Sequence, residues 1–138
     1  MRFPRVTLVV TGLVFVGLGL WFLIDPRGAS RFVSLQPAGS SQVAIRAVDG
    51  GLQLGLGIFF LVANARARWI RAGLGTVILA CGGLAFGRAA GMMMEGHYDR
   101  VHTGFVAAEL FGVAVGCAAF VRARAVYDAS RSDRRRME

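Results

Sequence analysis

Charged and amide side chains stand inside apolar runs of this sequence, at spacings that bring them together. Arg46, Asp49 and Gln53 lie at positions i, i+3 and i+7, which share one face of a helix. Arg88 interrupts a later apolar run and Glu109 interrupts the next one. In a membrane such charges are costly unless they face inward and pair. Two arginines and two acids sum to zero, so we expect one neutral, mutually paired cluster.

This cluster is compatible with several kinds of function. It could only fix the register of the helices, or it could bind a small molecule, a lipid headgroup or an ion. A buried carboxyl, Asp49 or Glu109, could also act as a general acid or base in a membrane enzyme or redox partner. An oligomeric transporter or channel is a further alternative, although it needs a polar path through cytoplasmic helix halves that look uncharged. We favour a non-enzymatic accessory or small-ligand or lipid-binding protein, with no catalytic residue.

A short polar segment follows Arg88 and contributes further groups. Glu95 is seven residues after Arg88 and therefore on the same helix face, at the mouth of the cluster. This segment holds four possible metal ligands: Glu95, His97, Asp99 and His102. Zinc sites use such side chains, but short polar loops often hold histidine, so we assign no metal and no cofactor. Cys81 and Cys117 lie in apolar runs and are expected to be packing residues rather than a redox pair.

The composition indicates which elements must position these groups. Of 138 residues, 55% are hydrophobic and a further 19 are glycine, whereas apolar residues and glycine together make up roughly 45–50% of soluble domains. A soluble domain this small has too little interior for so much apolar surface. The net charge of +8 comes from arginines between the apolar runs, so we expect a membrane protein and no nucleic-acid partner.

Four apolar segments approach or exceed the roughly 20 residues that a membrane-spanning helix needs. They are residues 6–24, 43–65, 69–93 and 103–121. The first is longer than a signal-peptide core and ends in bulky residues, so we expect it to be retained. The connections are a loop over 26–42, a tight basic turn over 64–68 and a polar loop over 95–102. The sequence predicts an all-α, transmembrane, up-down four-helix bundle over residues 1–121, followed by a basic cytoplasmic tail over 122–138.

The distribution of arginine predicts the orientation of the bundle. Eleven arginines belong to the N-terminus, the second connection or the tail: Arg2, Arg5, Arg66, Arg68, Arg71, Arg122, Arg124, Arg131, Arg134, Arg135 and Arg136. Only Arg27, Arg31 and Arg100 lie in the other two connections. Positive residues favour the cytoplasmic side, so both termini are predicted to be cytoplasmic in a multi-pass inner-membrane protein. We expect the tail to contact anionic lipid headgroups.

The spans also place the charged residues at one depth. Asp49 and Glu109 each lie six residues inside the outer start of their helix, which corresponds to roughly 9 Å at the rise of an α-helix. Arg88 lies a similar distance from the outer end of its helix. The polar cluster is therefore predicted in the outer half of the bilayer.

Glycines four residues apart recur in three of the spans. The pairs and triplet are Gly51 with Gly55, Gly83 with Gly87 and Gly91, and Gly112 with Gly116. Small residues at this spacing let helix backbones approach closely. We expect them to pack within the bundle, with a homo-oligomer interface through these faces as the alternative.

The motifs together resemble a known family. They are similar to the signature of small bacterial four-helix membrane proteins classed as a domain of unknown function, which are distantly DoxX-like. The resemblance is carried by the run over residues 45–59, the Gly87–Gly91 segment, the Glu95-Gly96 pair and the acid at Glu109. Asp49 departs from that pattern, in which an aromatic residue often stands there. The resemblance covers about residues 6–121 and implies no activity. It implies these polar family positions: Arg46, Arg88, Glu95 and Glu109.

Overall fold

The computed structural model describes residues 2–33 and 41–137 of the chain, with side chains described as far as residue 125. Among these residues, four helical segments are long and apolar enough to cross a membrane. They are Arg2–Ile24, Ser41–Ala65, Ala67–Glu95 and Arg100–Ala125. Each predicted span lies within one of these segments. The protein is thus all-α, with four packed candidate spans of a multi-pass membrane protein.

The helices follow one another in simple order along the chain. They are α1 (Arg2–Ile24), α2 (Pro26–Phe32), α3 (Ser41–Ile45), π-helix η1 (Arg46–Leu52), α4 (Gln53–Ala65), 3₁₀-helix η2 (Ala67–Trp69), α5 (Ile70–Glu95) and α6 (Arg100–Met137). The segment α3–η1–α4 is continuous and forms the second span. Because helices satisfy their own backbone hydrogen bonds, these glycine-rich segments remain helical in hydrocarbon.

The predicted loop over residues 26–42 is wrong in its first part, which forms α2. The carboxylate of Asp25 accepts a hydrogen bond from the Gly28 N–H at 2.9 Å, and Pro26 occupies the first helical position. Both features start helices, so a short helix follows Asp25 directly. The part of that predicted loop over residues 34–40 lies outside the described residues.

The basic segment predicted as a cytoplasmic tail continues α6. The helix runs without interruption from Arg100 to Met137, so the tail begins within this helix. The side chains beyond residue 125 lie outside the described part, so their expected contact with anionic headgroups stays a prediction.

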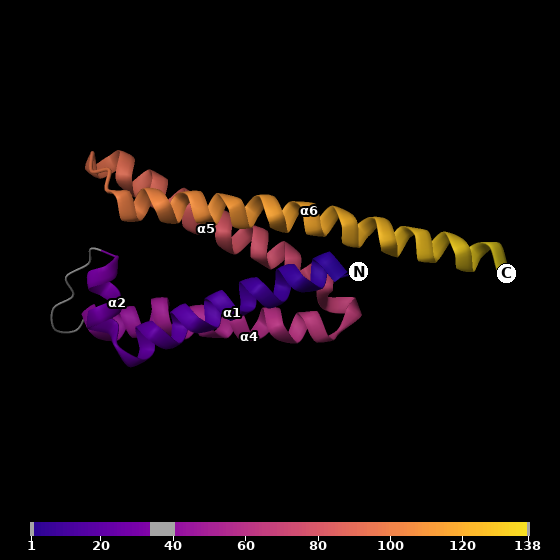
Figure 1. Cartoon of the computed structure of the whole chain (residues 1–138), viewed down its shortest axis with the longest axis horizontal. Helices are drawn as coiled ribbons and strands as arrows, with labels where there is room; N and C mark the ends of the chain where they lie inside the picture. The colour runs from indigo at the N-terminus through magenta and orange to yellow at the C-terminus, as the bar shows by residue number, and fades with distance from the viewer. Residues whose placement is uncertain (1, 34–40, 138) are drawn as a thin grey trace.

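The spans pack as two antiparallel helical hairpins (Figure 1). One hairpin joins α1 with η1 and α4, and the other joins α5 with α6. The N-terminus, η2 and the extended end of α6 lie toward one end of the molecule, called here the Trp69 end. Helix α2 and the loop between α5 and α6 lie at the other, called the Asp99 end.

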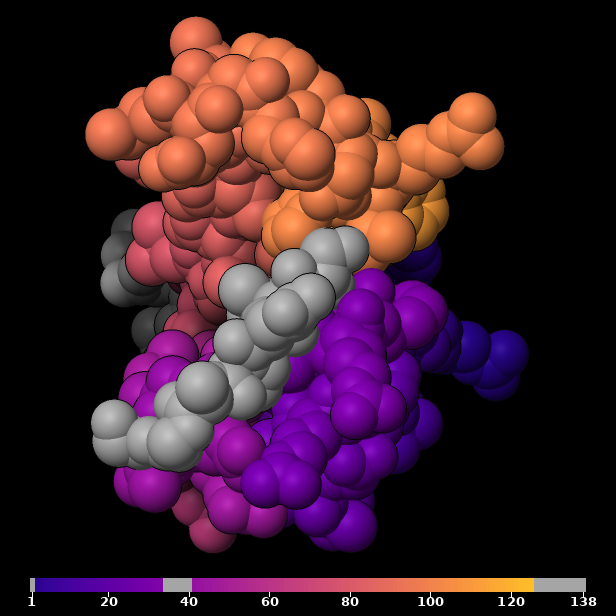
Figure 2. Space-filling model, turned by 90° about the vertical axis from the view of Figure 1, so that its left-hand side faces the viewer, coloured from indigo at the N-terminus to yellow at the C-terminus, as the bar shows by residue number. Residues whose placement is uncertain are grey.

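The main core is formed where all four spans meet, and most of it lies toward the Trp69 end. Its buried side chains are Leu8, Phe15, Phe60, Ala63, Ile70, Leu74, Val77, Cys81, Ala119 and Ala123. The Phe15 and Phe60 rings meet edge to face, with centroids 5.4 Å apart, a favourable aromatic geometry. Toward the Asp99 end the hairpins diverge, and the end view shows two lobes (Figures 1 and 2).

A small aromatic cluster bridges the two lobes at the Asp99 end. The Phe32 ring of α2 lies 5.4 Å from the Trp21 ring of α1 and 6.3 Å from the Phe105 ring of α6. Phe22 and Ala29 belong to a second buried core, against which Phe105 packs. Helix α2 therefore links α1 to the α5–α6 hairpin.

The glycines that join α1 to its partner differ from those predicted. A Cβ at Gly19 would lie 2.6 Å from the Leu54 backbone nitrogen, and one at Gly57 would lie 2.7 Å from the Val16 backbone nitrogen. A Cβ at Gly12 or Gly50 would lie 2.9 or 2.7 Å from a leucine side-chain carbon. These four seam glycines are spaced in sevens on each helix, a pattern that the search for fourfold spacing missed.

The predicted glycine motifs behave in two ways. Gly112 and Gly116 pack as expected, because a Cβ at either would lie 3.0 Å from a side chain of α5. The prediction of packing within the bundle is wrong for Gly55 and for three glycines of α5, where a Cβ would meet no atom of the described residues within 4 Å. The three are Gly83, Gly87 and Gly91, called here the groove glycines because they line the groove described below.

Candidate functional site

An ion pair joins the two helices of the second hairpin. The Arg88 Nε donates to Glu109 Oε1 at 2.9 Å, and the side chains are only 25% and 10% exposed. The Arg88 guanidinium carbon also lies 4.7 Å from the centroid of the Phe105 ring, a cation–π distance. This pair is the part of the expected charge cluster that the structure brings into direct contact.

One oxygen of this pair remains unsatisfied. Glu109 Oε2 is fully buried and has no hydrogen-bond partner among the described residues. Arg88 uses one of its N–H groups on Glu109, and a guanidinium has five such donors. The contact is therefore through a single oxygen, which leaves donors of Arg88 for another group.

The second span does not place its polar residues on one face as predicted. Arg46 turns toward α1, where its Nε donates to the backbone oxygen of Leu23 at 3.2 Å. Asp49 lies in η1, within range of the positive charge of Arg88. Within the described residues, neither Asp49 nor Gln53 forms a side-chain hydrogen bond, and both are half-buried.

The reason for this difference is the π-helix. In η1 the backbone bonds run from i to i+5 instead of i to i+4, so residues three apart no longer share one face. Gly50 and Gly51 lie within this turn, and a Cβ at Gly50 would lie 2.7 Å from a Leu23 side-chain carbon. The adjacent glycines are the sequence signal that was available for an irregular turn. Turns of this type are frequent at functional sites.

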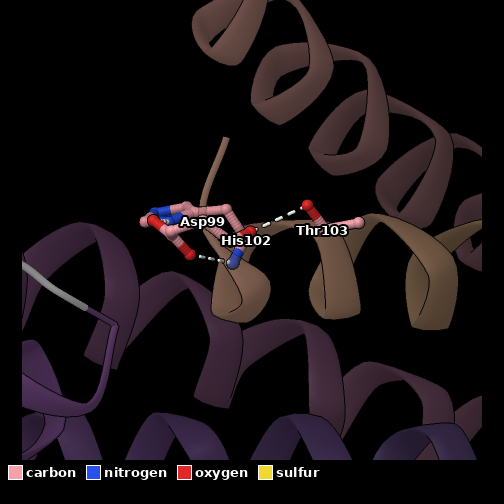
Figure 3. Close-up of polar contacts among 3 residues, drawn as sticks. All are labelled: Asp99, His102 and Thr103. Atoms are coloured by element: carbon pink, nitrogen blue, oxygen red, sulfur yellow. Dashed lines mark hydrogen bonds and ion pairs between the residues drawn. The ribbon is translucent and has the colours of Figure 1, made fainter. Parts of the chain in front are cut away.

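The loop at the Asp99 end is organised around one carboxylate. Gly96 ends α5 in the left-handed conformation, with φ 62°, a common helix C-cap. Asp99 then precedes α6, and its Oδ1 accepts the His102 backbone N–H at 2.8 Å (Figure 3). The His102 ring Nδ1 lies 2.5 Å from Asp99 Oδ2, and the Thr103 hydroxyl donates to the Asp99 backbone oxygen at 2.7 Å.

These bonds stabilise the ionised form of Asp99. The hydrogen bonds from the His102 backbone and side chain, in that order, lower the pKa of the Asp99 carboxyl below 3.8, its ordinary value. Asp99 thus acts as an N-cap that stays negative near neutral pH. Asp99 therefore adds a negative charge close to Glu95, the last residue of α5.

The possible metal and redox clusters of the sequence do not assemble in the described part of the chain. No three His, Cys, Asp or Glu residues converge there as a metal site would require. Cys81 is buried, Cys117 is exposed, and both are free thiols. The Cys81 sulfur instead packs against Gly112.

A groove runs along α5 to the start of α6 and has a volume of about 480 Å³. Its lining residues are Gly83, Leu84, Gly87, Arg88, Gly91, Met92, Glu95, His97, Asp99 and His102. Pockets of roughly 300–1,000 Å³ are typical of ligand sites. Of the residues selected from sequence as a site, Arg88 and Glu95 line this groove, and Glu109 supports it through Arg88. Arg46, Asp49 and Gln53 do not line it.

Sequence reasoning missed the floor of the groove. The groove glycines were expected to contact another helix, and the two histidines and Asp99 were considered only as metal ligands. The signal that was available is the position of the glycine triplet, which leads directly to Arg88 and Glu95 on the same helix.

Comparison with known proteins places the chain in a family. No curated protein and no solved structure is significantly similar to it. Residues 3–120, nearly all of the four-span region, match the family model described as a domain of unknown function, DUF4345. This agrees with the resemblance that the sequence motifs indicate. The chain therefore belongs to the DUF4345 family of domains of unknown function.

Proposed function

We propose that this protein binds a membrane lipid or a similar amphiphile in the groove of α5. The observation that carries the proposal is the composition of the groove from one end to the other. The groove glycines and Leu84 provide an apolar channel at the depth of the bilayer, and Arg88, Glu95 and the loop side chains provide a polar mouth. An amphiphile has the same order of apolar and polar parts.

The Arg88–Glu109 pair supports a binding role. Glu109 holds the guanidinium in place and offsets part of the cost of burying it, while Arg88 keeps donors for a ligand. In this proposal Arg88 is the binding residue and Glu109 a positioning residue. No catalytic group is required.

We further propose that the Asp99 end faces outward and that both termini are cytoplasmic, in the cytoplasmic membrane. The support is the arginine bias together with the aromatic anchors at the Trp69 end. The guanidinium carbons of Arg66 and Arg68 lie 4.8 and 5.9 Å from the Trp69 ring centroid, and that of Arg122 lies 4.7 Å from the Phe3 ring. Such pairs of arginine and aromatic rings suit the headgroup region on the cytoplasmic side.

Filling the groove tests the proposed function. Gly87→Leu puts a bulky side chain on the groove floor, where nothing packs within 4 Å. Gly55→Leu is the matched control, because Gly55 is also exposed and open but lies on α4. Lipids that remain bound after purification in mild detergent are identified by native mass spectrometry. We expect a bound lipid in the wild type and in Gly55→Leu and its loss in Gly87→Leu, whereas equal lipid retention in all three would overturn the proposal.

A further inference from the structure

The charges along the groove follow a definite order. On α5 the groove glycines Gly83 and Gly87 come first, the cation Arg88 follows, and Glu95 lies two helical turns nearer the end of the helix. Two turns correspond to roughly 10 Å along the axis. From the interior outward, the groove is therefore apolar, then positive, then negative.

The mouth carries more negative than positive charge. Its lining residues include two acids, Glu95 and Asp99. The single cation of the lining, Arg88, is already shared with Glu109. Asp99 is already bonded to His102, so Glu95 is the acid of the mouth that favours a ligand group with positive charge and hydrogen-bond donors.

We infer that the ligand is a zwitterionic phospholipid with a primary amine, in which an acyl chain lies on the groove glycines, the phosphate meets Arg88 and the ammonium meets Glu95. This inference rests on the proposed function and names the class of lipid. Its order of tail, negative phosphate and positive amine is the complement of the groove. Guanidinium groups bind phosphate oxygens with charge-assisted hydrogen bonds, and carboxylates do the same for ammonium.

The lining also distinguishes among headgroups. A primary ammonium has three N–H donors for Glu95 and its neighbours, whereas a quaternary ammonium has none and is usually bound by aromatic faces. Among the described residues, those that line the groove include no Phe, Tyr or Trp. A glycerol headgroup brings no positive charge to the acids at the mouth. The amine-bearing lipid is thus preferred over both.

The test is a competition among three lipids with identical acyl chains. Delipidated protein in detergent receives equal amounts of phosphatidylethanolamine, phosphatidylglycerol and phosphatidylcholine, and native mass spectrometry measures the bound fractions. A charge-assisted hydrogen bond corresponds to about a tenfold difference in affinity, so we expect about that preference for phosphatidylethanolamine. Glu95→Gln should reduce the preference to near unity without preventing lipid binding.

The matched control is Asp25→Asn, which neutralises an acid at the same end of the molecule but outside the groove lining. Asn also caps helices, so α2 is retained, and the preference for the amine should be unchanged. Binding that Gly87→Leu abolishes, but without preference among headgroups or without an effect of Glu95→Gln, would overturn this inference and leave the proposed function intact. Binding of no lipid, or binding that is insensitive to Gly87→Leu, would overturn both.

Discussion

The seam glycines of the first hairpin and the groove glycines of α5 have opposite roles. In the first hairpin a Cβ at any of the seam glycines would lie less than 3.0 Å from an atom of the facing helix, and at Gly19 and Gly57 that atom is backbone. In the α5–α6 hairpin a Cβ at any of the groove glycines would contact no described atom within 4 Å. Beside these glycines the two helices are joined by the Arg88–Glu109 pair. The comparison teaches that one small residue can close an interface or keep a surface open, depending on which way its helix faces.

The largest expected effect is on the pair that joins the second hairpin. Arg88→Leu leaves Glu109 buried without its partner, which should lower the free energy of unfolding by about 3 kcal/mol. The double variant Arg88→Leu with Glu109→Leu removes both charges and should recover most of that loss. Thermal unfolding in detergent measures both, and an unchanged melting temperature in Arg88→Leu would show that the pair does not hold this hairpin.

The seam of the first hairpin should respond to the smallest possible side chain. Gly19→Ala forces a Cβ against the backbone of Leu54, which cannot move aside as a flexible side chain would. Overpacking of this kind costs about 1–3 kcal/mol. Gly17→Ala is the control on the same helix, since a Cβ there meets nothing within 4 Å. Equal melting temperatures for the two variants would argue against a close seam.

How much of this could be predicted from sequence depends on the kind of feature. The four spans were predictable, because each needs only a long apolar run between polar segments. Whether a glycine packs against another helix or lines the groove was not predictable, because it depends on how each helix is rotated about its axis. Gly83-x-x-x-Gly87 and Gly112-x-x-x-Gly116 have the same spacing, yet only the second pair packs against a helix.

The polar residues show the same limit. Arg88 and Glu109 could be expected to pair, because each is a lone charge in a long apolar run. The separation of Arg46 from Asp49 and Gln53 could not be predicted. It depends on the π-helix, which changes the register of the residues that follow Arg46. The helix cap at Asp99 was overlooked because Asp99 and His102 were considered as metal ligands rather than as the start of a helix.

A smaller effect is expected at that cap, and it depends on pH. The folded state lowers the Asp99 pKa below 3.8, so ionised Asp99 stabilises the fold above that pH and loses this contribution as the pH falls through the folded-state pKa. Asp99→Ala should lower the melting temperature at pH 7, and the difference from wild type should shrink below pH 3.8. Asp99→Asn, which retains an oxygen for the His102 N–H, should lose less. A difference that stays constant with pH would mean that the charge of Asp99 is not involved.

The smallest effect on stability is expected in the groove itself. Gly87→Leu adds a side chain where no described atom lies within 4 Å, so its free energy of unfolding in detergent should remain within about 0.5 kcal/mol of wild type, as for other surface changes. A clear loss of stability would mean that the groove glycines contact another helix or a second copy of the chain. Cross-linking at low protein concentration separates these two cases.

The central claim is that the groove glycines of α5 form a lipid-binding surface, whereas the seam glycines of α1, η1 and α4 pack against another helix. A phospholipid with a photoreactive acyl chain, added to the protein in vesicles, tests it most directly when the labelled peptides are mapped by mass spectrometry. The account predicts that labelling concentrates on Leu84 and Met92 beside the groove and is lost in Gly87→Leu but not in Gly55→Leu. Labelling spread evenly over the four spans, and unaffected by Gly87→Leu, would contradict it.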